Sequence, residues 1–150
     1  MANETKHVKM SFEDRCADQL AGATTLHYAG VDFDTTSVTE WIRPRVLGFS
    51  PIGESGVQVG VRRELWTFSF DVFVRVGLAG ETTHRAYELA DAVRTAFDRI
   101  DLSVLDWTGD QTQEALIYFN RGDLTPVLET KEGRHTLQQL NVSYTGVLWA

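Results

Sequence analysis

The sequence has one cysteine, three prolines and no long apolar run among its 150 residues. A single cysteine, Cys16, cannot form a disulfide within the chain, which suits a reducing compartment. The apolar runs are too short to span a bilayer. The first ten residues, MANETKHVKM, also lack the apolar segment of a secretory signal. We therefore expect the protein to stay in the cytoplasm where it is made, without contacting a membrane.

Basic residues are also scarce. Lysine and arginine together number 14 against 21 acidic residues, giving a formal charge of -7. This negative charge argues against a protein that binds nucleic acid over a wide surface. DNA could still pass along such a surface without binding to it. Hydrophobic residues make up 43% and charged residues 23% of the chain, as in globular proteins. The length favours one domain spanning residues 1–150.

The most regular pattern is LWTFSFDVFVRVG, residues 65–77, in which apolar residues occupy the even positions from Trp66 to Val76. This alternation predicts a long strand with one apolar face. Residues 41–49, WIRPRVLGF, also read as a strand, and Pro44 places it at a sheet edge or a bulge. We predict a long β-hairpin over 41–76 with a mobile glycine-rich tip. The apolar residues lie on odd-numbered positions before Arg62 and on even-numbered positions after Arg63. This switch predicts a bulge near Arg62 and Arg63.

Two helices are expected to flank the sheet. The first spans 9–22, with Ser11 as its N-cap and Phe12, Cys16 and Leu20 forming an apolar stripe. The main helix spans 82–100 and has a clean apolar face. Residues 101–150 read as shorter strands at 102–107, 115–119 and 124–130, followed by a final alternating strand. Residues 24–30, TTLHYAG, read as a further short strand. The predicted class is α+β, with a sheet of four to six strands that are mostly antiparallel or mixed.

Few residues have the spacing of a chemical site. His84, Glu88 and Asp91 share one helical face, a spacing that suits a metal ion or an acid–base pair. A polar face opposite an apolar stripe is equally what a surface helix shows, and we favour that interpretation. Asp32 and Asp34 form an isolated Asp-x-Asp motif of low specificity. We therefore predict no catalytic residue, no cofactor and no metal site, and we do not expect an enzyme.

Arg43, Arg45, Arg62 and Arg63 cluster on the flanks of the predicted hairpin. They either keep a solvated hairpin from aggregating through its edge or form an interface with an acidic partner. Trp149 stands one residue from the end of the sequence, where a large ring is hard to bury internally. Aromatic residues are enriched in interface cores, so Trp149 is a candidate subunit contact.

The order of these elements resembles the tail terminator, or tail completion, proteins of long-tailed bacteriophages. The resemblance covers about residues 10–147. Its main motif is LWTFSFDVFVRVGLAGETTHRAYELADAVRTAFD, a long strand that passes through a glycine-containing turn into a helix. The positions that match the family pattern are Phe73, Gly80, Leu89, Ala90, Asp91, Val93, Arg94 and Phe97.

The resemblance implies a structural virion protein in the neck region of the tail, assembled in the host cytoplasm. Such subunits form a ring, typically a hexamer, on the head-proximal end of the tail tube. The ring ends polymerisation of the tail tube protein and binds a head-side connector or stopper protein. DNA passes through its lumen without specific binding, and no catalysis is involved. Three alternatives stay open: another neck or tail component (a head–tail joining or tail tube protein), a monomeric module that binds a ligand along the hairpin, and a small enzyme using His84, Glu88 and Asp91.

Overall fold

The structure is a computed structural model that describes residues 4–28, 30–34, 38–52, 63–76, 82–132 and 135–150. It contains two helices and a six-stranded sheet whose named strands all pair antiparallel, so the class is α+β, as the sequence predicted. In the described part of the chain, neither helix is long and apolar enough to cross a membrane. The elements in chain order are α1 (Glu4–Leu20), β1 (Glu40–Pro51), β2 (Arg63–Arg75), α2 (Thr82–Phe97), β3 (Asp101–Leu105), β4 (Gln113–Phe119), β5 (Asp123–Glu132) and β6 (His135–Trp149).

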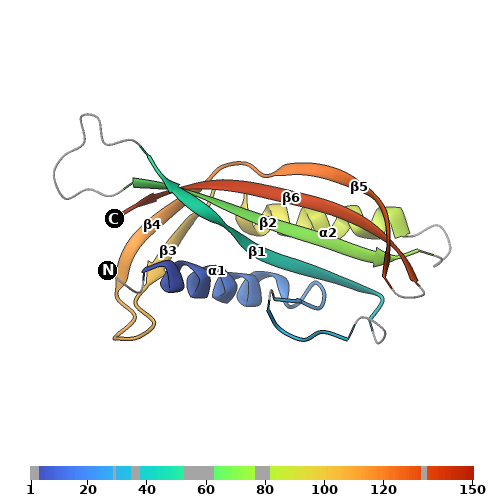
Figure 1. Ribbon diagram of the computed structural model, residues 1–150, viewed down its shortest axis with the longest axis horizontal. Helices are drawn as coiled ribbons and strands as arrows, with labels where there is room; N and C mark the ends of the chain where they lie inside the picture. Colours follow the sequence, from blue (N-terminus) through green and yellow to red (C-terminus); the bar gives the residue numbers. More distant parts are fainter. Residues whose placement is uncertain (1–3, 29, 35–37, 53–62, 77–81, 133–134) are drawn as a thin grey trace.

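The sheet is organised around β2 and β6. Its strand order is β1-β2-β6-β4-β3, and β5 pairs with β6 beside this path. The register of β2 and β6 is unbroken from Arg63 opposite Trp149 to Arg75 opposite Leu137. On its other edge, β6 pairs with β4 near its C-terminal end and with β5 along the rest. Both long strands follow the longest axis of the molecule (Figure 1).

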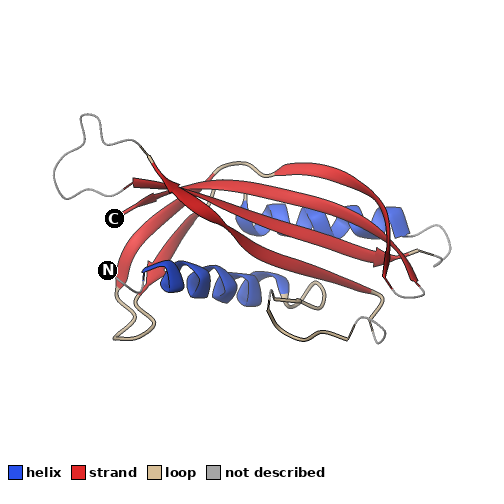
Figure 2. Cartoon of the chain, viewed as in Figure 1, coloured by secondary structure: helices blue, strands red, loops and turns tan. Residues whose placement is uncertain are grey.

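One face of the sheet and both helices enclose the main core (Figure 2). Strand alternation sends the even-numbered residues of β2 from Trp66 to Val74 into this core, as the sequence predicted. Cys16 is buried there too, among the residues of the α1 stripe. Phe97, the last residue of α2, lies at the centre of an aromatic cluster. Its ring centroid is 4.8–6.2 Å from the ring centroids of Phe12, Phe70, Phe119 and Tyr144.

The opposite face of the sheet, here called the outer face, carries no helix in the described part of the chain. One end of it is covered by the segment that precedes β1. There Trp41 stacks on Phe73 with ring centroids 5.0 Å apart, and Phe33 and Val38 pack against this pair. The outer face therefore has an apolar covered end, while its middle and its other end lie outside this small cluster.

Two local predictions were wrong. The first helix begins at Glu4 rather than at residue 9, because Val8 adds another turn to the apolar stripe. Ser11 therefore lies inside α1 and is not its N-cap. Its hydroxyl accepts hydrogen bonds of 3.0 Å from the Leu105 amide and from the Trp107 indole. The described part of the segment TTLHYAG is not a strand. It contributes one parallel bridge, between Leu26 and Ile42.

The first strand of the hairpin lies at the sheet edge, as Pro44 predicted. Its register with β2 shifts between Val46 and Gly48. Gly48 has a φ of 144°, a conformation that L-residues with side chains rarely adopt. The predicted tip and the predicted parity change around Arg62 lie outside the described residues.

Replacing Phe97 with alanine should lower the free energy of unfolding by about 3–5 kcal/mol, because it leaves a cavity inside the aromatic cluster. Tyr87→Ala on the exposed side of the same helix should change it by no more than about 0.5 kcal/mol. Urea denaturation followed by tryptophan fluorescence measures both variants. Equal stability of Phe97→Ala and the wild type would show that the ring does not support the core.

Candidate functional site

The middle of the outer face is built around a buried carboxylate. Asp71 alternates outward on β2, and its side chain is only 3% exposed. One carboxylate oxygen, Oδ2, binds the guanidinium groups of Arg43 and Arg45 at 3.1 and 2.8 Å. The other, Oδ1, accepts hydrogen bonds from the amides of Asn141 and Gln139 at 2.9 and 3.3 Å. Residues of β1, β2 and β6 therefore meet at one acceptor.

This arrangement gives the two hairpin arginines, Arg43 and Arg45, a structural role. Arg43 faces Asp71 directly in the β1–β2 register, and its guanidinium also lies 5.1 Å from the centroid of the Phe73 ring. Arg43 and Arg45 are thus ordered by a buried partner and are not simply solvated charges. Two arginines share one carboxylate, so this group contributes a net positive charge to an acidic chain.

A second group lies at the C-terminal end of β6. Arg63 faces Trp149 across the sheet, and its guanidinium lies 4.3 Å from the centroid of the Trp149 ring. In the neighbouring row, Val147 is flanked by Leu65 on β2 and Tyr118 on β4. Directly opposed residues in antiparallel strands share a face. Trp149, Tyr118 and Leu65 are 46%, 42% and 37% exposed.

These side chains form what we call the terminal patch: Arg63, Leu65, Tyr118, Val147 and Trp149. It is a contiguous, largely apolar surface crossing three strands. Soluble proteins usually expose apolar side chains singly, and clustered ones mark interaction surfaces. The predicted interface residues therefore divide between the Asp71 network, which holds Arg43 and Arg45, and the terminal patch, which holds Arg63 and Trp149. Arg62 lies outside the described residues.

Sequence reasoning missed Asp71, Leu65 and Tyr118. Asp71 was visible only as one acidic residue within an apolar strand, and its role depends on which residues of β1 face it. Tyr118 reaches the patch because β4 pairs with the last residues of β6. Neither pairing can be read from local periodicity, which gives the face of a residue but not its neighbours.

The candidate group on α2 does not form a metal site in the described part of the chain. His84, Glu88 and Asp91 are exposed on α2, and Glu88 pairs with Arg85 at 3.2 Å. Burial raises the pKa of the Cys16 thiol well above its ordinary value, so this cysteine is a poor nucleophile. On the outer face, no described set of histidine, cysteine and carboxylate side chains has the spacing of a metal site. The outer face thus presents ordered arginine donors and exposed apolar side chains.

Comparison with known proteins gives the fold alone. No protein-family model matches the sequence. No curated protein matches it either. A solved structure whose name states no function is similar to this chain, with 12% sequence identity and a TM-score of 0.54. The match covers 95% of this chain and 94% of that chain.

Replacing Asp71 with asparagine should lower the free energy of unfolding by about 1.5–3 kcal/mol, because a charged acceptor of several hydrogen bonds is lost beside two arginines. Asp91→Asn, at an exposed position of α2, is the matched control and should have little effect. Chemical denaturation at neutral pH compares the two. A loss no greater than that of the control would mean that Asp71 does not hold the outer face together.

Proposed function

We propose that this protein is a structural ring subunit of a phage or phage-like tail, of the tail terminator type. The ring would cap the head-proximal end of the tail tube, end its polymerisation and join it to the head-side connector or stopper protein. The resemblance of the long strand, turn and helix motif to that family supports the proposal. The α+β fold with its long strands is compatible with it.

The observation that carries the proposal is the terminal patch. It combines two exposed aromatic side chains, aliphatic neighbours and an arginine, a composition enriched at protein interfaces. It is built on paired strands, so its side chains are held in a fixed arrangement before any partner binds. We infer that a neighbouring subunit covers Trp149 in the ring.

The Asp71 network gives the same face an electrostatic character. Arg43 and Arg45 stay about one-third exposed while bound to Asp71, so they present ordered donors. An acidic surface of a neighbouring subunit or of the tail tube would complement them. Such pairs fix the orientation of a complex more than they add affinity. The acidic balance of the whole chain fits a lumen through which DNA passes without binding.

A specific feature favours the binding-module alternative. A hollow of about 570 Å³ lies between the start of α1 and the distal half of β1, and Lys6, Lys9, Leu47 and Phe49 are among its lining residues. Leu47 and Phe49 are exposed. A monomeric module would place an apolar or acidic ligand there. A stable monomer that binds such a ligand and does not assemble would favour this alternative.

Native mass spectrometry over a range of protein and magnesium concentrations tests the ring. A closed oligomer of about six subunits is expected, because the resembled family forms hexamers and because two different surfaces that meet head to tail generate a ring when the rotation between subunits closes. Long stacks would instead indicate a tail tube protein. A monomer under every condition that also fails to bind isolated tail tubes would contradict both tail functions.

Trp149→Ala should abolish or strongly weaken this assembly while the fold is retained, because it removes the most exposed aromatic ring of the terminal patch. Tyr87→Ala is the control, since it removes an exposed aromatic ring from α2, away from the patch. Circular dichroism checks the fold, and analytical ultracentrifugation measures assembly. Normal assembly of Trp149→Ala would exclude this residue from the subunit contact.

A further inference from the structure

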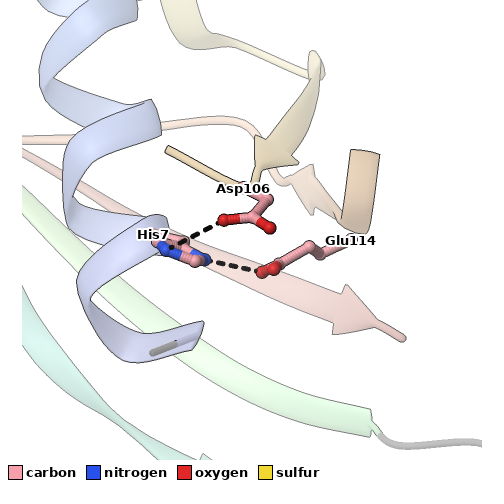
Figure 3. A group of neighbouring side chains, drawn as sticks. All are labelled: His7, Asp106 and Glu114. Carbon is pink, nitrogen blue, oxygen red and sulfur yellow. Dashed lines mark hydrogen bonds and ion pairs between the residues drawn. The ribbon is translucent and has the colours of Figure 1, made fainter. Parts of the chain in front are cut away.

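A histidine of the first helix is buried against two carboxylates from the other half of the chain. His7 lies in α1, and its side chain is 2% exposed. Figure 3 shows its imidazole pointing between Asp106, which follows β3, and Glu114 on β4. The distance from Nδ1 to Glu114 Oε2 is 2.8 Å, and the distance from Nε2 to Asp106 Oδ1 is 3.6 Å. His7 is far from Asp106 and Glu114 in the sequence, so no local motif indicates this cluster.

The two ring nitrogens of His7 have different surroundings. Nδ1 makes a short hydrogen bond with the Glu114 carboxyl group, and Nδ1 is its donor wherever that group is a carboxylate. Nε2 is buried and has no hydrogen-bond partner among the described residues. In the neutral imidazole, Nε2 then holds a lone pair that faces Asp106. Two acceptors directed at each other repel unless a proton or a metal cation lies between them.

The spacing suits such a cation. Zinc binds histidine nitrogen at about 2.0–2.1 Å and carboxylate oxygen at about 2.0–2.2 Å. Two bonds of that length across the 3.6 Å gap would meet at an angle of about 120°, slightly wider than tetrahedral. Metal-bound histidines usually donate their other ring N–H to a carboxylate, which fixes the tautomer. Glu114 occupies that position at Nδ1.

The Asp106 carboxylate is held in place by hydrogen bonds from Thr108. The Thr108 hydroxyl and amide donate to its Oδ1 at 2.7 and 3.0 Å. The hydrogen bond from the Thr108 side chain lowers the pKa of the Asp106 carboxyl, which keeps it ionised. Asp106 and Glu114 are each partly exposed, so an ion and its waters have access from solvent.

We propose that His7, Asp106 and Glu114 form a binding site for a divalent transition-metal ion, with zinc as its best occupant. His7 Nε2 and the Asp106 carboxylate are the protein ligands, water completes the coordination, and Glu114 orients the imidazole. The bound ion would tie the start of α1 to the connection between β3 and β4. This site is independent of the proposed ring.

Isothermal titration calorimetry of chelator-treated, dialysed protein with zinc chloride tests the site. One ion per chain is expected, confirmed by native mass spectrometry. Magnesium and calcium should not compete, because these ions prefer oxygen ligands only. Cobalt(II) in place of zinc should give a visible absorption band that reports coordination by His7. No binding of zinc, or zinc that magnesium displaces, would overturn the proposal.

Variants identify the ligands. His7→Gln and Asp106→Asn each remove a zinc ligand and should abolish zinc binding or weaken it by much more than about ten-fold. Glu114→Gln removes the residue that orients the imidazole and should weaken zinc binding by about 10–100-fold. His84→Gln removes an exposed histidine and should leave binding unchanged. If His7→Gln fails to fold, Asp106→Asn on the partly exposed loop decides. Zinc binding that survives Asp106→Asn, or that is lost in His84→Gln, would show an adventitious surface site and overturn the assignment.

A second measurement separates the metal site from an ion pair. Nitrogen-15 NMR at neutral pH, without and with zinc, reports the protonation of each His7 ring nitrogen. With zinc bound, the proposal expects a proton on Nδ1 alone. A doubly protonated ring that stays so when zinc is added would show an imidazolium held between two carboxylates, and would overturn the metal site.

Discussion

The fold depends on the pairing of β2 with β6 along their whole length. One face of the β2–β6 pair packs against the helices in the main core, and its other face forms the centre of the outer face. Phe68, Phe70 and Val72 pack under the helices, while Asp71 lies between them on the opposite side. A charged side chain can be buried there only with compensation, because an unpaired buried charge is very costly. Two arginines and two amides supply that compensation from the neighbouring strands.

This compensation links the fold to its candidate interface. The donors that Asp71 requires are also the donors that remain partly exposed on the outer face. At the other end of the same ladder, Arg63 and Trp149 stack, and Leu65, Val147 and Tyr118 lie in the next row. The surface proposed for assembly is therefore made of residues whose positions follow from strand register. Loop conformation contributes little to it.

The sequence predicted those features that local periodicity determines. The even-numbered residues of β2, the apolar stripe of α1 and the edge position of the strand with Pro44 all follow from local patterns. It did not predict what depends on long-range pairing. Ser11 looked like a helix cap because serine favours that position, but it lies within the helix and binds Leu105 and Trp107. His7 had no recognisable partner because its carboxylates belong to the β3–β4 region. Trp149 was expected to be exposed, but its neighbours Leu65 and Tyr118 could not be inferred.

The position of β6 in the chain has a consequence for synthesis. This strand pairs with β2, β4 and β5, yet it is the last of the eight elements to leave the ribosome. Until then, β2 has β1 on one edge but no strand on its other edge, and the donors Asn141 and Gln139 are absent from Asp71. Long-range pairing of this kind slows folding and leaves strand edges open in the nascent chain. Growing chains are thus exposed to pairing with one another through the open edge of β2 until β6 is made.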